Sequence, residues 1–290
     1  MKISGFTIIK NALLNDYPIV EAITSILPLV DEMIVLIGDS KDDTEQLIRN
    51  IQSPKIKIHH SVWDTVTYTS GTVLAAETNK AFNLTDPESE WAFYIQGDEA
   101  VHEKYHAIIQ QACAQYKDDK KVEGLLFNYL HFYGTYDYVG DSRKWYDKEV
   151  RIIRNDKKIR SYRDAQGFRV GARKLQVKQL DAYIYHYGWV KSAETMMAKN
   201  THVAEVWHKD ESLAKYKLSD LSHNFGHFDS LKLFKLTHPA VYQKRILEKN
   251  WHLELDISKK HFSLKNRLLY YVEKWTGVRL FNFKSYKIIR

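Results

Sequence analysis

The sequence has 290 residues, enough to bury a large core in one domain or in one domain with an appendage. Hydrophobic residues make up 44% and charged residues 27% of the chain, which is typical of a folded globular protein and excludes a disordered one. The single cysteine, Cys113, excludes an intrachain disulfide and a zinc site built from several cysteines. We find no signal peptide and no stretch near the roughly 18 apolar residues of a membrane span, so we expect a cytoplasmic protein.

The net charge is +7, and the basic excess lies at the C-terminal end. Residues 231–290 hold 14 Lys and Arg against four Asp and Glu, whereas the other 230 residues hold 29 against 32. This asymmetry favours a partner with negative charge, although a solvated basic helical face would also explain it. We favour a membrane surface and expect no nucleic acid.

The first half of the chain alternates strand-like and helix-like segments. The predicted strands are residues 3–9, 32–37, 55–60 and 91–95. The predicted helices are residues 16–27, 43–51 and 72–82. This order predicts an α/β fold with a mainly parallel sheet and helices on both faces. Ligands of such sheets bind beyond the carboxyl ends of the strands.

The pattern changes from about residue 122. Strands are predicted at 122–132 and 180–186, and a β-hairpin is predicted from 150–154 and 159–162. Helices are predicted at 242–253 and 263–275. We therefore divide the chain into a catalytic domain, 1–208, and a basic helical C-terminal region, 209–290.

The predicted helix 263–275 is amphipathic. Its apolar residues near one side are Leu264, Leu268, Tyr271, Val272 and Trp275. Basic residues flank this side, a pattern typical of helices that lie at a membrane interface. We predict peripheral membrane contact through the basic C-terminal helices, and packing against the rest of the chain would give the same pattern.

Two acidic turns follow predicted strands. The turn GDSKDDT, residues 38–44, follows the second strand, and QGDE, residues 96–99, follows the fourth. An Asp at the first turn suits a nucleobase or ribose, and carboxylates at the second suit Mg²⁺ or Mn²⁺ shared with substrate phosphates. Neither the glycine-rich dinucleotide motif nor the P-loop motif is present.

With these turns, the order of elements resembles family 2 glycosyltransferases of the GT-A fold over roughly residues 3–190. The resemblance implies that Asp39 binds the nucleotide base and that Asn11, after the first strand, lies in the nucleotide site. It also implies that Asp98 stands at the second position of the metal-binding Asp-x-Asp motif. Gln96 occupies the first position, where the family has Asp, and we assign Gln96 and Asp98 to nucleotide binding.

The same resemblance extends to the second half. The segment YRDAQGF, residues 162–168, resembles the acceptor-side loop, so Asp164 is our first candidate for the catalytic base. Glu99 and Glu103 are the other catalytic candidates. The segment YHYGW, residues 185–189, resembles the late strand whose histidine can be a metal ligand, which implies His186 beside Asp98.

These residues predict an inverting, metal-assisted glycosyltransferase that moves one sugar from a nucleotide-sugar donor, with UDP favoured. The Gln-x-x-Arg-Trp signature of processive synthases is incomplete because Val170 replaces its Trp. The resemblance implies a glycan or lipid-linked acceptor in bacterial surface polysaccharide or lipopolysaccharide synthesis. The alternative is an inactive GT-A-like module that binds a glycan or another anionic partner, and a sugar nucleotidyltransferase is a third, weaker possibility.

Overall fold

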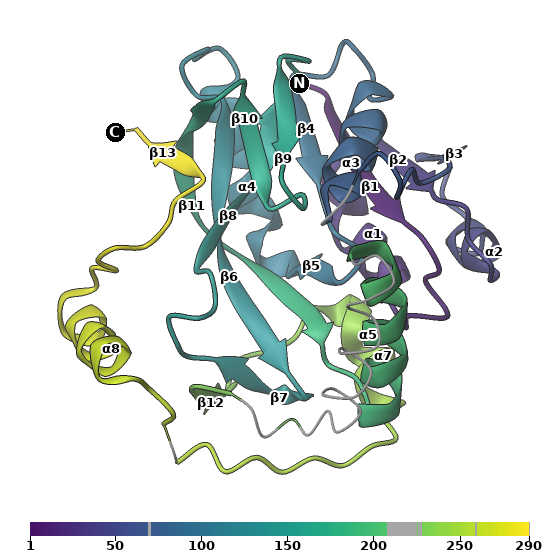
Figure 1. Ribbon diagram of the computed structural model, residues 1–290. Coiled ribbons are helices and arrows are strands. Elements are labelled where there is room, and N and C mark those ends of the chain that lie inside the picture. The colour runs from purple at the N-terminus through teal and green to yellow at the C-terminus, as the bar shows by residue number, and fades with distance from the viewer. Residues whose placement is uncertain (69–70, 208–224, 226–227, 259, 290) are drawn as a thin grey trace.

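A computed structural model describes residues 1–68, 71–207, 225, 228–258 and 260–289, without the side chains of 201–207 (Figure 1). The first half forms four parallel strands in the order β3-β2-β1-β4. Their bounds are β1 (Ile3–Ile9), β2 (Glu32–Ile37), β3 (Ile56–His60) and β4 (Trp91–Tyr94). Every residue of β1, β2 and β4 is buried, as expected for strands covered on both faces.

Helices cover both faces of this parallel half-sheet. The helices are α1 (Ile19–Ile26), η1 (Leu27–Leu29), α2 (Thr44–Arg49), α3 (Thr72–Asn83) and α4 (His106–Tyr116). Alternate residues of β2 point to opposite faces, so Val35 joins the core cluster that contains α1 and α4, and Ile34 joins the cluster with Phe82 of α3. The predicted α/β class, with helices on both faces of a parallel half-sheet, is confirmed.

Helix α1 begins three residues later than the pattern predicts. Asp16 has a φ angle of 47°, which lies outside the range of a right-handed helix. Pro18 then stands at the N-cap position, and the helix proper starts at Ile19. The residues between β1 and α1 therefore form a loop at the carboxyl end of β1.

The second half continues the sheet with mixed directions. Its elements are β5 (Glu99–Val101), η2 (Glu103–Tyr105), β6 (Gly124–Tyr133), β7 (Thr135–Gly140), β8 (Lys148–Arg154), β9 (Ile159–Tyr162), β10 (Gly167–Val170) and β11 (Arg173–Trp189). The order continues from β4 as β8-β6-β11-β10-β9. The predicted hairpin of 150–154 with 159–162 is wrong. Strand β8 lies between β4 and β6 and has no free edge, so β9 pairs with β10 instead.

The C-terminal region is partly helical. It holds α5 (Ala193–Trp207), β12 (Leu231–Leu233), η3 (Ala240–Tyr242), α7 (Gln243–Leu247), α8 (Leu264–Thr276) and β13 (Tyr286–Ile288). Helix α8 matches its prediction, but the helix predicted at 242–253 ends at Leu247. The chain beyond alternates apolar residues, and Leu253, Leu255 and Ile257 pack against the cluster around Phe228.

Two strands of this region join the central sheet, since β12 pairs with β7 and β13 pairs with β11. The domain boundary predicted at 208 falls outside the described residues. Within the described chain, no helix is both long and apolar enough to cross a bilayer.

Candidate active site

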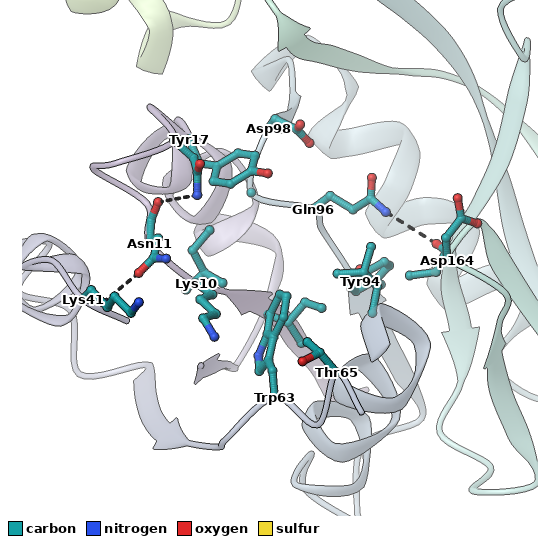
Figure 2. Close-up of a pocket in the computed structure, with 16 residues that line it drawn as sticks. Lys10, Asn11, Tyr17, Lys41, Trp63, Thr65, Tyr94, Gln96, Asp98 and Asp164 are labelled. Atoms are coloured by element: carbon teal, nitrogen blue, oxygen red, sulfur yellow. Dashed lines mark hydrogen bonds between the residues drawn. The ribbon is translucent and has the colours of Figure 1, made fainter. Parts of the chain in front are cut away.

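A pocket of about 420 Å³ opens at the carboxyl ends of β1 and β4 (Figure 2). Its polar lining includes Lys10, Asn11, Tyr17, Lys41, Trp63, Thr65, Gln96, Asp98 and Asp164. These residues come from the loops after β1, β2, β3 and β4, and from the loop between β9 and β10. The pocket therefore lies where an open α/β sheet binds its ligand.

Asn11 holds two of these loops together. Its φ angle of 53° is one that Asn tolerates better than most residues. Its side-chain oxygen accepts a 2.7 Å hydrogen bond from the Lys41 amide, and its own amide donates to the Ser40 hydroxyl at 3.0 Å. Asn11 thus lines the pocket, and its side-chain oxygen is already bound to the chain.

Asp39 is not among the residues that line the pocket, and its side chain is partly exposed. One carboxylate oxygen lies 2.7 Å from Nζ of Lys10, and the other accepts a 3.1 Å bond from the Trp63 amide. Burial raises the pKa of Asp39, but the bonds from Lys10 and from the Trp63 amide outweigh it and leave the pKa lowered. Asp39 therefore positions Lys10 and Trp63, whose ammonium and ring lie 5.7 Å apart at the pocket.

Asp98 lies deep in the pocket with no direct hydrogen bond from another described side chain. Nε2 of His186 is 3.7 Å from Oδ1, and Nζ of Lys199 is 3.6 Å from Oδ2. Burial raises the pKa of Asp98, but nearby positive charges, those of Lys199 and Lys191 among them, outweigh burial and leave the pKa lowered. A Cβ at Gly188 would lie 2.6 Å from Oδ2 of Asp98, so the glycine of YHYGW leaves room for this carboxylate.

A chain of hydrogen bonds sets the tautomer of His186. Nε2 of His131 lies 2.8 Å from the Tyr146 carbonyl, which can only accept, so this nitrogen carries a proton. Burial holds the pKa of His131 well below its usual range, so the ring is neutral and its Nδ1 is bare. The Nδ1 of His186, 3.3 Å away, must then be the donor.

His186 is also neutral, because burial lowers its pKa more than Asp98 raises it. With the proton on Nδ1, its Nε2 presents a lone pair to the Asp98 carboxylate. The carboxylate of Asp98 and the lone pair of His186 are both hydrogen-bond acceptors, so a cation between them would stabilise the arrangement. A carboxylate and an imidazole suit Mg²⁺ less well than Mn²⁺, which accepts both ligand types. The described residues contain no group of three metal-ligating side chains, so a substrate would have to complete the coordination.

Gln96 lies between Asp98 and Asp164 in Figure 2. Its side-chain amide lies 3.5 Å from the Ala165 carbonyl, and its side chain lines the pocket. An amide is a weak metal ligand but a good hydrogen-bond partner for hydroxyl groups.

Asp164 points into the pocket from a strained loop. The residues on both sides of it, Arg163 and Ala165, have φ angles of 57° and 60°. Its Oδ1 is buried without a hydrogen-bond partner, and burial raises the pKa of the carboxyl. Its Oδ2 accepts only a long, 3.5 Å bond from the Gln166 amide. A weakly bonded carboxylate with a raised pKa at a pocket wall has the properties of a general base.

Glu99 does not fit the catalytic role that we predicted. The residue is fully buried and bidentate with Arg151, with 2.7 and 2.9 Å bonds, and Tyr129 donates a third bond of 2.7 Å. Its carboxylate is therefore saturated and cannot reach a substrate hydroxyl. Arg151 is equally buried, so this pair stabilises the turn behind Asp98.

Glu103 also lies outside the pocket. Its side chain is half exposed in η2, where it accepts a 3.1 Å bond from the Ala240 amide and lies 3.3 Å from Nδ1 of His102. These contacts join η2 to the segment before α7. The structure thus brings Asn11, Gln96, Asp98 and Asp164 to one pocket, with His186 directly behind Asp98.

Two lysines near Asp98, Lys191 and Lys199, were not among the site residues predicted from the sequence. Lys199 of α5 donates a 3.0 Å bond to the Gly188 carbonyl, and its ammonium lies 4.8 Å from the Tyr17 ring centre. Lys191 is buried, bonds to Asp16, and has its pKa lowered to about 8 by burial. Lys191 lies in the short loop between β11 and α5, and Lys199 lies on α5, so both come to Asp98 from the end of the long strand β11.

Comparisons with known proteins return structures only. No family model matches the chain, and no curated protein matches it. One match is the structure of residues 1–349 of TarS from S. aureus, which is 17% identical in sequence to this chain and has a TM-score of 0.38. The match covers 76% of this chain and 71% of that one. Glucosyl-3-phosphoglycerate synthase from Mycobacterium tuberculosis with Mg²⁺ and uridine diphosphate is 19% identical with a TM-score of 0.31, over 45% and 43%.

A third match is 4-diphosphocytidyl-2C-methyl-D-erythritol synthase from Anaerococcus prevotii, 13% identical with a TM-score of 0.38, over 68% of this chain and 94% of that one. At these sequence identities and TM-scores, the matches reflect a general similarity of backbone course and say nothing about the activity of this protein. The function proposed below rests on the pocket itself.

Proposed function

We propose that this protein is a glycosyltransferase that moves a single sugar from a nucleotide-sugar donor, with UDP favoured, to a hydroxyl acceptor. The observation that carries the proposal is the facing pair of Asp98 and the bare nitrogen of His186, in a pocket that is also lined by Asp164, a carboxylate with one unpaired oxygen. A cation site and a separate base in one pocket are the two parts that such a transfer needs.

The nucleoside half of the donor fits the part of the pocket near Trp63. The indole ring and the Lys10 ammonium lie side by side there, held by Asp39. An aromatic face binds a base by stacking, and a nearby lysine is attractive to phosphate or carbonyl oxygens. Asp39, predicted to bind the base directly, acts in this proposal by fixing both groups.

The diphosphate lies near Asp98. Asp98 and His186 would hold Mg²⁺ or Mn²⁺, which supplies Lewis-acid stabilisation of the departing diphosphate when bound. Lys199, whose ammonium is 3.6 Å from Asp98, can add a second positive charge beside the leaving group. This charge acts on the diphosphate and not on the metal ion, so it does not replace the carboxylate that the motif has where this chain has Gln96.

Asp164 takes the proton of the acceptor hydroxyl in this proposal. Its raised pKa brings the carboxyl closer to neutral pH, where a base is most effective. An attack from the face opposite the nucleotide inverts the anomeric carbon through an oxocarbenium-like transition state.

The acceptor and setting are proposed from the family resemblance. That resemblance favours a glycan or lipid-linked acceptor in bacterial surface polysaccharide or lipopolysaccharide synthesis, with the protein on the cytoplasmic side of the membrane. A single transfer is favoured because Val170 replaces the tryptophan of the processive signature.

A thermal-shift screen of UDP-, GDP-, CMP- and dTDP-sugars, each with and without Mn²⁺, tests the proposal. We expect one nucleotide to raise the melting temperature only with Mn²⁺, and Asp98→Asn to remove the effect. Glu103→Gln, outside the pocket, should respond like the unchanged protein. If no nucleotide stabilises the protein, the alternative of an inactive module that binds a glycan or another anionic partner replaces this proposal.

A further inference from the structure

Helix α8 presents its apolar side to solvent. Leu264, Leu268, Tyr271 and Trp275 recur at spacings of four, three and four residues, which places them on one stripe of the helix. Their exposed fractions are 85%, 67%, 48% and 83%. An amphipathic helix of a globular protein normally turns such a stripe toward the core. Helix α8 instead turns its apolar stripe toward solvent.

Polar contacts on other sides of α8 fix this orientation. The Tyr270 hydroxyl donates to Asp141 at 2.5 Å, and Nζ of Lys274 lies 2.7 Å from the same carboxylate. Glu273 accepts a 2.6 Å bond from Arg143. The helix is therefore attached to the loop after β7 by charged and hydroxyl groups. Burying the stripe against the body would break these bonds.

The chain after α8 extends the exposed apolar surface. Leu280, Phe281 and Phe283 have exposed fractions of 41%, 87% and 61%. In Figure 1, α8 and this segment lie on the outer side of the molecule, away from the central sheet. We call the stripe together with these three residues the α8 face. Large exposed apolar side chains gathered on one helix and on the segment that follows it indicate an interaction site.

The charge around the α8 face identifies its partner. Residues 264–289 contain six Lys and Arg but one acid, Glu273, which is already bound to Arg143. Lys265 and Arg267 lie on either side of the stripe, are exposed, and form no ion pair with another described residue. Aromatic residues such as Trp275 favour the boundary between lipid chains and head groups.

We propose that the α8 face binds the surface of an anionic lipid bilayer, with the stripe in the head-group region and Lys265 and Arg267 at the phosphates. A second copy of the chain is a poorer partner, because pairing two such faces would bring their unpaired basic groups together. The proposal does not depend on transfer activity. It would place a transferase beside a lipid-linked acceptor.

Flotation of the full chain with vesicles tests this proposal. The vesicles are phosphatidylcholine alone or phosphatidylcholine mixed with phosphatidylglycerol. We expect binding to the anionic vesicles that weakens with added salt, since the lipid charge is screened. The triple variant Leu264→Ser, Leu268→Ser, Trp275→Ser should lose roughly tenfold or more in affinity. Lys265→Glu with Arg267→Glu should lose roughly tenfold at low salt.

The matched control is Leu236→Ser with Leu247→Ser, two leucines with exposed fractions of 65% and 83% outside the α8 face. This control should float like the unchanged protein. Circular dichroism and the melting temperature without ligand check that each variant is folded. The proposal is overturned if the triple variant floats with anionic vesicles as well as the unchanged protein does, or if the unchanged protein does not float at all. A dimer in sedimentation velocity that the triple variant abolishes would assign the face to a second copy instead.

Discussion

The Nε2 atom of His186 lies 3.7 Å from Oδ1 of Asp98. The hydrogen bonds behind His186, together with the lowered pKa values of His131 and His186, leave that nitrogen without a proton at neutral pH. A carboxylate and a lone pair at this separation repel unless a cation lies between them. The relationship depends on His131, which never reaches the pocket. It also depends on Gly188, where a side chain would collide with Asp98.

The first prediction concerns His131. Replacing it with alanine removes the acceptor for the Nδ1 proton of His186, so the ring can turn or change tautomer. Loss of such a supporting partner typically weakens metal binding about 10- to 100-fold. We expect the Mn²⁺ concentration for half-maximal UDP binding to rise by that factor. His60→Ala, an exposed histidine at the sheet edge, is the control, and an unchanged Mn²⁺ requirement in His131→Ala would contradict the tautomer argument.

The second prediction separates binding from chemistry. Asp164→Asn keeps the shape of the side chain but removes the base, so kcat should fall about 10²- to 10⁴-fold. The dissociation constant for UDP with Mn²⁺ should stay within about twofold, because Asp164 makes no contact with Asp98 or His186 that fixes the cation. Steady-state kinetics and calorimetry measure the two quantities. Full activity of Asp164→Asn would exclude it as the base.

The third prediction is a pH dependence. Burial raises the pKa of Asp164 from its usual 3.8, and a base works only when ionised. Below this raised pKa, kcat/KM should therefore fall tenfold for each pH unit. The decline should begin at a higher pH than it would for an aspartate with the usual pKa. Asp98 has a lowered pKa and stays ionised there. The residual activity of Asp164→Asn should lack this acidic limb, and its persistence would assign the limb to another group.

The fourth prediction concerns the buried pair of Glu99 and Arg151. Glu99→Ala leaves the Arg151 charge buried without its partner, which should cost about 3 to 5 kcal/mol of unfolding free energy. Replacing both residues together, as Glu99→Leu with Arg151→Met, should cost less than the single change. Urea denaturation measures both. A single variant as stable as the unchanged protein would mean that the pair is dispensable.

Much of the parallel half-sheet was predictable because its strands carry their own signals. The apolar run of β2, residues 32–37, and the turns that follow β2 and β4 are local patterns, and they placed Asp98 correctly at a strand end. The second half gave weaker signals. The segment 150–154 looks like one arm of a hairpin, but β8 has both edges occupied by β4 and β6, and tertiary pairing of that kind is invisible in sequence.

The candidate site shows the same contrast between residues placed by local patterns and residues placed by long-range packing. Glu99 follows Asp98 directly, and proximity in sequence suggested a shared role, but alternation along β5 turns Glu99 inward to Arg151. Lys199 is 101 positions from Asp98 in the chain, so no local pattern could connect them. Residues that touch the pocket through neighbouring turns were predictable, and residues brought there by long-range packing were not.

The most direct test of the central claim is calorimetric titration of UDP with and without Mn²⁺ into the unchanged protein, Asp98→Asn and Glu103→Gln. The account predicts that UDP binds the unchanged protein and Glu103→Gln only with Mn²⁺, and that Asp98→Asn loses this binding. Equal binding of UDP without Mn²⁺, or Mn²⁺-dependent binding that survives in Asp98→Asn, would contradict the claim that Asp98 and His186 hold the cation.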